Sequence, residues 1–245
     1  MTDTAAPNML RTGLGVLLGM LAVLGWGIYN VGAEIGQAQG FRPADLTMLR
    51  FGVGALVLLP WFLWRGWRLN QRRLVILALV VGPVFAMMFN AGFRLAPLAH
   101  AVVIGPGMSV LMALFLVRVI DGQRISLRRM LALGLLVAGL VVIGLDRGAP
   151  KSLTGSVLLG DLCFIGSGSL WGLYSYLLGR WKMPPVETTA GVALYASVVF
   201  VPLYLIVWGI PDLGRALWLE QALYQGLIGG SGALVAFAGA VSVMG

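Results

Sequence analysis

Two short aromatic motifs carry the side chains best suited to bind a small molecule. Trp26-Gly27-Ile28-Tyr29 recurs 145 residues later as Trp171-Gly172-Leu173-Tyr174. The tryptophan and the tyrosine of each motif are three residues apart, so they share one face of a helix. Both motifs lie inside long apolar segments. We therefore expect Trp26, Tyr29, Trp171 and Tyr174 to line a central cavity, the alternative being an interfacial belt of membrane tryptophans.

Polar side chains inside apolar segments are costly, so each of them is a candidate site. Asn30 and Asn90 either line the same cavity or form hydrogen bonds with a neighbouring helix. Glu34 and Arg50 flank a short predicted loop, which makes them candidates for an ion pair. Glu34 is also the candidate for a carboxylate that couples transport to protons.

Helix-breaking and titratable residues add four further positions. Pro83 and Pro106 lie inside predicted helices, where each removes a backbone hydrogen bond, and we expect bends there. Asp161 begins an apolar segment, where a carboxylate interacts favourably with the helix N-terminus. His100 lies near the start of another segment, and we expect an interfacial histidine there rather than a proton relay.

The sequence lacks the patterns that mark an enzyme. Its single histidine excludes a His-Glu-x-x-His zinc site, and neither a Gly-x-Ser-x-Gly elbow nor a glycine-rich loop ending in Lys-Ser or Lys-Thr occurs. Cys163 is the only cysteine, so no disulfide forms within the chain. We expect no catalytic residue, no metal site, no cofactor and no use of ATP.

The elements that position these residues are predicted to be membrane-spanning helices. The chain is 59% hydrophobic and 11% charged, with a mean hydropathy of +0.93, which leaves too little polar surface for a soluble protein. A span of about 20 apolar residues crosses roughly 30 Å of hydrocarbon. We predict eight spans, at residues 13–33, 51–64, 74–93, 95–117, 130–145, 162–179, 188–211 and 221–245.

The basic residues indicate the orientation of these spans. The net charge is +8, and the basic residues form short clusters between spans. With a cytoplasmic N-terminus, eleven of the seventeen lysines and arginines lie on the inner side. The positive-inside rule therefore predicts an inner-membrane protein with its N-terminus in the cytoplasm. It also explains the charge without a nucleic-acid partner.

The aromatic motifs indicate a duplicated chain. We predict a tail at residues 1–12, a first repeat of five spans at 13–147 and a second repeat of three spans at 152–245. Because five is odd, the second repeat is inverted in the membrane, as in many secondary transporters. The second repeat lacks counterparts of the fourth and fifth spans, and we expect about 50 further residues, enough for two spans, to complete ten.

The chain resembles the EamA family of the drug/metabolite transporter superfamily. The likeness rests on the Trp-Gly motifs, on Leu49-Arg50-Phe51, on the run from Phe93 to Ala99 and on Gly160-Asp161-Leu162. Where the family usually has Gly-Glu before its fifth helix, this chain has Asp121-Gly122. The resemblance implies two inverted repeats of five helices, a central cavity that opens alternately to each side, and no cofactor.

The leading hypothesis is a secondary transporter that exports or exchanges small metabolites such as amino acids or drugs. Its expected partners are a small-molecule substrate, the lipid bilayer and a proton or other coupling ion, with a homo-oligomer as a further option. Two alternatives come from other classes: a membrane enzyme acting on lipid or isoprenoid substrates, and a membrane scaffold or fragment that transports nothing.

Overall fold

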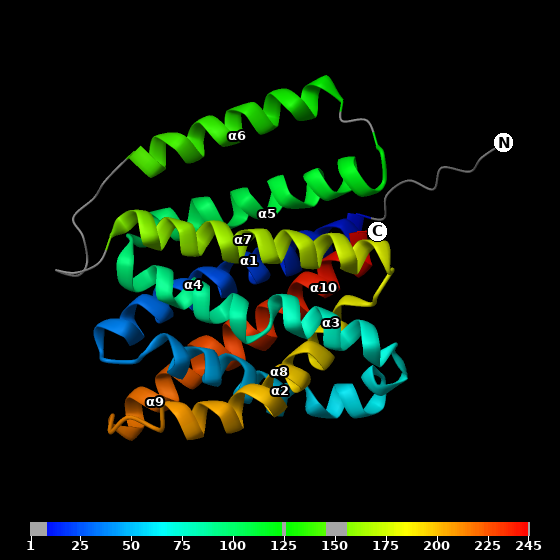
Figure 1. The fold of residues 1–245 in the computed structure, drawn as a ribbon. Helices are drawn as coiled ribbons and strands as arrows, with labels where there is room; N and C mark the ends of the chain where they lie inside the picture. Colours follow the sequence, from blue (N-terminus) through cyan, green and yellow to red (C-terminus); the bar gives the residue numbers. More distant parts are fainter. Residues whose placement is uncertain (1–8, 124–125, 146–155, 245) are drawn as a thin grey trace.

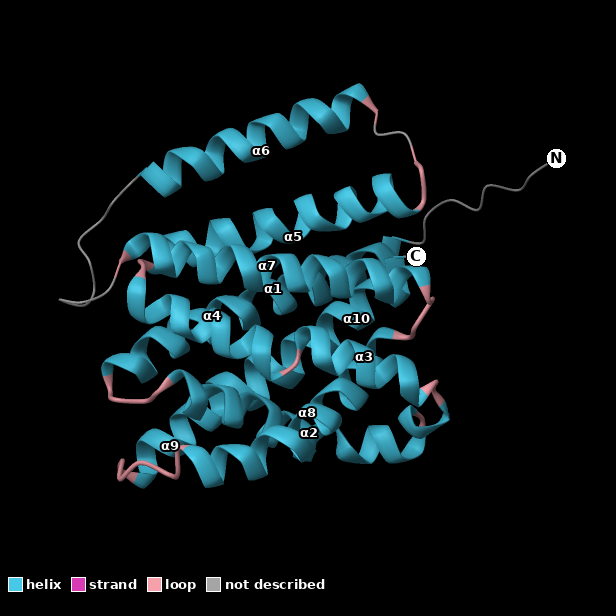
Figure 2. Cartoon of the chain, viewed as in Figure 1, coloured by secondary structure: helices cyan, strands magenta, loops and turns pink. Residues whose placement is uncertain are grey.

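We describe the fold from a computed structural model of the chain, for residues 9–123, 126–145 and 156–244. Within these ranges all regular structure is helical and no strand occurs (Figure 2). The helices pass back and forth across one bundle, and the first helix begins at the same end of the bundle at which the last helix ends (Figure 1). The predicted all-α membrane fold is confirmed.

The first two helices are longer than predicted. α1 covers Met9–Ala38 and α2 covers Pro43–Trp64. Between them the backbone turns at Gly40, whose φ of +102° suits a residue without a side chain. Pro43 begins α2 because a proline at the first helical position lacks an N–H that would have no partner there. A short 3₁₀ turn, η1 (Gly66–Arg68), follows α2.

The predicted third span is interrupted in the middle. α3 (Gln71–Val81) ends at Gly82, and Pro83 begins α4 (Pro83–Leu95). By contrast α5 (Leu98–Ile120) continues through Pro106 as one helix. α6 (Leu127–Leu145) completes the first half of the chain.

The second half begins with two long helices and ends with a third, irregular span. α7 covers Val157–Arg180 and α8 covers Pro185–Val207. The last span consists of α9 (Arg215–Gln221), the π-helix η2 (Ala222–Gly232) and α10 (Ala233–Met244). A π-helix of this length is unusual, since most π-helices are a single turn. Where they do occur, they are often at functional sites.

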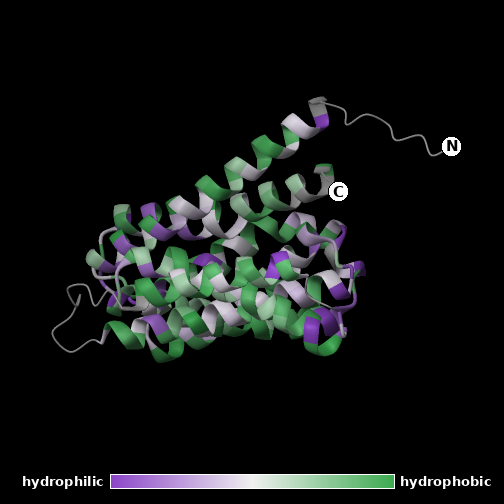
Figure 3. Ribbon diagram, turned by 90° about the horizontal axis from the view of Figure 1, so that it is seen from above, coloured by the Kyte–Doolittle hydropathy of each residue, from purple (hydrophilic) through white to green (hydrophobic). Residues whose placement is uncertain are grey.

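Six segments of the described chain are long and apolar enough to cross a membrane: α1, α2, α3 with α4, α5, α7 and α8. The other two predicted spans are α6 and the irregular α9–η2–α10 segment. Seen from above, apolar residues dominate the length of the bundle, while most strongly hydrophilic residues lie toward its ends (Figure 3). This distribution is the one that a bilayer requires.

Packing between the helices repeats in the two halves. α1 packs along η2 and α10, just as α7 packs along α4 and α3. α2 packs against η2, as α8 packs against α3, and α2 and α8 pack against each other. α5 lies along α7. Most contacts made by a helix of one half are therefore also made by the corresponding helix of the other half. Related halves are expected to pack in this way.

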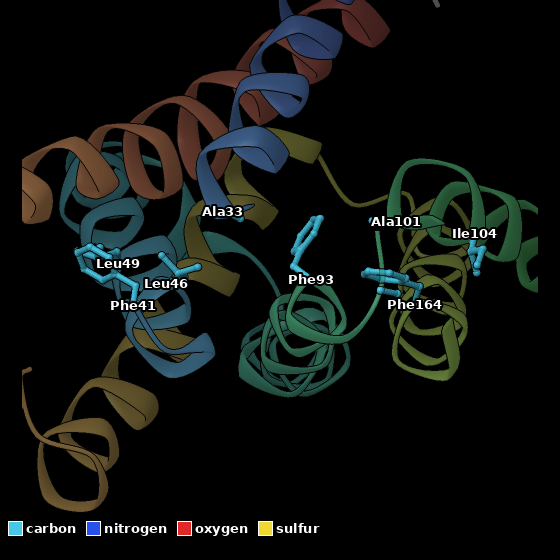
Figure 4. Packing of buried hydrophobic residues seen from close by; sticks show 9 residues of the cluster. Ala33, Phe41, Leu46, Leu49, Phe93, Ala101, Ile104 and Phe164 are labelled. Atoms are coloured by element: carbon cyan, nitrogen blue, oxygen red, sulfur yellow. The ribbon is translucent and has the colours of Figure 1, made fainter. Parts of the chain in front are cut away.

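Aromatic rings lie at the centre of one buried hydrophobic cluster (Figure 4). The ring centroids of Phe93 on α4 and Phe164 on α7 are 5.6 Å apart, and the two ring planes make an angle of 68°. Both side chains are fully buried or nearly so. Gly92 allows this approach, because a Cβ at that position would meet the Phe164 ring. The cluster fixes α4 against α7 beside the two aromatic motifs.

The glycines of the two aromatic motifs have different surroundings. A Cβ on Gly172 would lie 2.7 Å from Met112 Cβ and closer still to the Ser109 carbonyl, so α7 and α5 are in backbone contact there. A Cβ on Gly27 would meet nothing within 4 Å among the described residues. The two halves therefore differ at this point, because α5 covers α7 and no described helix covers the same face of α1.

Candidate functional site

The two aromatic motifs meet at a central cavity. Trp26 on α1 and Trp171 on α7 are in edge-to-face contact, with ring centroids 6.4 Å apart. Beside them lies a cavity of about 290 Å³. Five helices supply its walls, with the following lining residues: Trp26, Tyr29, Asn30, Arg50, Phe85, Phe89, Gly105, Pro106, Ser109, Gly168 and Trp171.

Two phenylalanines complete the aromatic lining, and the sequence analysis did not single them out. The ring centroids of Phe85 and Trp171 are 5.4 Å apart. Phe89 stacks on Tyr29, with ring centroids 6.4 Å apart and an angle of only 13° between the ring planes. Both belong to α4. Their spacing of four residues, just after the break at Pro83, places them on one helix face. That spacing is the signal by which they could have been found.

Arg50 is the charged group of the cavity, and its surroundings correct the predicted ion pair with Glu34. Its guanidinium carbon lies over the rings of Tyr29, Phe51 and Phe85, at 4.9, 5.9 and 5.4 Å from their centroids. Within the described residues it forms no hydrogen bond and no ion pair. The side chain lies among these rings, where cation–π attraction holds it.

Glu34 lies half-buried on α1. Its side chain or backbone is engaged in at least one interaction, so Glu34 is not a free group. Its role as a coupling carboxylate stays a prediction.

Arg50 also lines a second, smaller cavity of about 30 Å³. Trp171 and Arg50 line both cavities, whereas Tyr174 and Thr189 line only the smaller one. Gly230 of η2 and Leu234 of α10 also border it. The structure thus places Trp26, Tyr29 and Trp171 around the larger cavity and separates Tyr174 from it.

The two predicted asparagines have different surroundings. Asn30 lines the larger cavity and is half-buried. Asn90 is fully buried between helices, where its side-chain Nδ2 donates to Thr47 Oγ1 at 3.2 Å, and its backbone carbonyl oxygen accepts from Gln37 Nε2 at 2.6 Å. Of the two options for Asn90, its contacts favour hydrogen bonding to neighbouring helices.

Of the two predicted helix-bend prolines, only Pro106 is a lining residue of the larger cavity. Pro83 begins α4 after the break at Gly82, two residues before Phe85. Pro106 lines the larger cavity, and its carbonyl oxygen accepts a hydrogen bond from Ser109 Oγ at 2.8 Å. Since α5 continues through Pro106 as one helix, a bend at that point stays a prediction.

His100 and Asp161 form a contact that the sequence analysis missed. His100 Nδ1 and Asp161 Oδ1 are 2.7 Å apart, and both side chains are nearly fully buried where α5 meets α7. With the carboxylate ionised, Nδ1 is the donor. The two residues are far apart in sequence, so no local pattern indicated the pair.

Two further acids, Asp45 and Asp121, are engaged in separate contacts. Buried Asp45 accepts from the Arg42 guanidinium at 2.7 Å and from Tyr204 Oη at 2.7 Å. This hydrogen bond to the carboxylate raises the pKa of Arg42 above its ordinary value. Asp121 accepts from Tyr176 and from Arg180. Among the described residues, no group of three His, Cys, Asp or Glu side chains gathers as metal ligands.

Comparisons with known proteins point to one family. The sequence profile of the EamA-like transporter family matches residues 13–145, which is more than half of the chain. No curated protein matches the chain in sequence. One solved structure, described only as the crystal structure of a protein, superposes with a TM-score of 0.59 at 21% identity, over 94% of this chain and 83% of that one. At this identity the likeness is one of fold.

Proposed function

The chain belongs to the EamA-like transporter family, and we propose that it is a secondary transporter of small metabolites. In this proposal the substrate binds in the aromatic cavity between α1, α2, α4, α5 and α7, and the cavity opens alternately to the two sides of the membrane. The basic residues favour a cytoplasmic N-terminus. Export or exchange across the cytoplasmic membrane is what the resemblance to the family implies.

The single observation that supports this proposal best is the meeting of Trp26 and Trp171 at the cavity. The two residues come from different halves of the chain, and their rings are 6.4 Å apart. Secondary transporters bind their substrates between related halves near the middle of the membrane. Rocking of the halves against each other changes the separation of these two rings. A ligand that contacts both rings from the cavity beside them therefore loses contacts when either side opens.

Counterflow in lipid vesicles that contain the full chain tests the proposal. Vesicles are loaded with single metabolites and the uptake of the same labelled metabolite is measured. For a transported metabolite, Trp26→Ala and Trp171→Ala should each lower the rate about tenfold or more, since each removes a large aromatic contact worth a few kcal/mol.

Trp64→Ala is the matched control. Trp64 lies at the end of α2, is 61% exposed and lies outside both cavities. It should leave the rate unchanged. The proposal fails if Trp26→Ala and Trp171→Ala insert normally and transport every substrate at the rate of the unaltered protein.

A further inference from the structure

We propose that Arg50 binds the carboxylate of the substrate, and that the substrate is a small organic anion with an apolar or aromatic body. This inference rests on the proposed function, because it assigns a ligand to the same cavity. The family match and the fold do not specify a substrate. The inference is drawn instead from the charge, the burial and the contacts of one side chain.

Arg50 is a buried cation that lacks an anionic partner among the described residues. Only 8% of its surface is exposed, yet it borders both cavities. In the described part of the chain its nitrogen atoms have no hydrogen-bond acceptor. Removing a charge from water without a partner is costly, and three aromatic rings offset only part of that cost. A ligand that brings a negative charge into the cavity supplies the missing partner.

The guanidinium group suits a carboxylate in shape as well as charge. Its nitrogen atoms form a planar fork that binds both oxygens of a carboxylate at once. The rings of Tyr29 and Phe85, 4.9 and 5.4 Å from the guanidinium carbon, fix the plane of that fork. Because the group is already held in place, little side-chain freedom is lost when an anion binds.

The rest of the cavity accepts an apolar body and disfavours a cation. Trp26, Phe89 and Pro106 are among its walls, and its lining contains no acidic residue. Aromatic rings can bind organic cations, but the guanidinium already lies on the rings of Tyr29 and Phe85. A second positive charge would be repelled. The volume of about 290 Å³ is near the lower limit of ligand pockets, which favours a small ligand.

Binding of three probes of equal size tests this assignment. The probes are 3-phenylpropionate, its neutral amide and the 3-phenylpropylammonium cation, and their dissociation constants are measured by calorimetry with the full chain in lipid nanodiscs. We expect the carboxylate to bind about tenfold to a hundredfold more tightly than the amide, the range for a hydrogen bond between charged groups. The cation should bind most weakly.

Substitutions assign the preference to Arg50. Arg50→Gln should remove the difference between the acid and the amide, and Arg50→Lys should keep part of it, because it retains the charge but not the planar fork. Arg73→Gln is the matched control. Arg73 also lies on an aromatic ring, 5.4 Å from the centroid of Trp181, but outside both cavities, and its replacement should leave all three constants unchanged.

Two results would overturn the assignment. One is equal affinity of the unaltered protein for the acid and the amide, and the other is a preference for the acid that persists in Arg50→Gln. If Arg50→Gln does not fold, the same measurement is made on Arg50→Ala. Loss of the preference for the acid in that folded variant supports the assignment, and persistence of the preference overturns it. Trp26→Ala distinguishes a failure of this assignment from a failure of the proposed function. If the probes bind this variant more weakly, the cavity still stands as a binding site. If they bind it as tightly as the unaltered protein, both the cavity and the carboxylate site are refuted as the place of binding.

Discussion

Replacing Gly172 with alanine places a methyl group in the contact between α7 and α5. The new Cβ would lie 2.7 Å from Met112 Cβ and closer still to the Ser109 carbonyl oxygen. Backbone cannot move aside as a flexible side chain can, so the two helices must separate. Gly27 is its counterpart in the first aromatic motif, and a Cβ there meets nothing within 4 Å among the described residues.

The magnitude follows from two opposing terms. Alanine stabilises a helix by about 1 kcal/mol relative to glycine, and this gain is the same at both sites. Overpacking at Gly172 costs roughly 1–3 kcal/mol, and this cost is absent at Gly27. Gly172→Ala should therefore be less stable than Gly27→Ala by roughly 1–3 kcal/mol. At about 2–4 °C per kcal/mol in a chain of this length, its Tm should be at least about 2 °C lower.

Thermal unfolding of both purified variants in the same detergent, followed by tryptophan fluorescence, measures this difference. Gly27→Ala should unfold at or above the temperature of the unaltered protein, and Gly172→Ala below that of Gly27→Ala. Equal destabilisation by the two substitutions would refute the reasoning. It would mean that the face of α1 around Gly27 is packed as tightly as that of α7.

Two further predictions concern buried polar contacts. His100→Ala and Asp161→Ala should each lower the Tm, because each leaves the other side chain buried without its polar partner. The double variant should lose less stability than the sum of the two single losses, by about 0.5–3 kcal/mol in a double-mutant cycle. Additive losses would show that the two side chains do not interact. Tyr204→Phe should cost about 1–3 kcal/mol in the same unfolding assay, since it removes a hydrogen bond to the fully buried Asp45; an unchanged Tm would contradict this.

Much of the fold could be predicted from the sequence, because hydrophobic runs determine where helices cross a membrane. Each predicted span corresponds to helical structure, although the third is divided at Gly82, the last contains η2, and the ends of others differ. Local residues explain those differences: Pro43 begins α2 eight residues before the predicted start, and Gly209, with a φ of +62°, follows the end of α8. The π-helix was missed, since its sequence, Ala222–Gly232, is equally compatible with an α-helix.

The candidate site was only partly predictable. The aromatic motifs indicated Trp26 and Trp171, because a repeated pattern marks corresponding positions in related halves. The direction of Arg50 could not be read in this way, since the rings of Phe85 and Tyr29 lie on two other helices. The site depends on contacts between helices, which a single sequence does not contain.

The two interrupted spans have a mechanical consequence. A continuous α-helix is a stiff rod, so a push at one end is carried to the other. The break at Gly82 divides one span, and η2 replaces the middle of its counterpart in the second half. Val81 and Gly230, at these two places, both border the smaller cavity. In the proposed transport cycle, each of these spans bends where its regular α-helix is interrupted, so that one end of the bundle opens while the other stays closed.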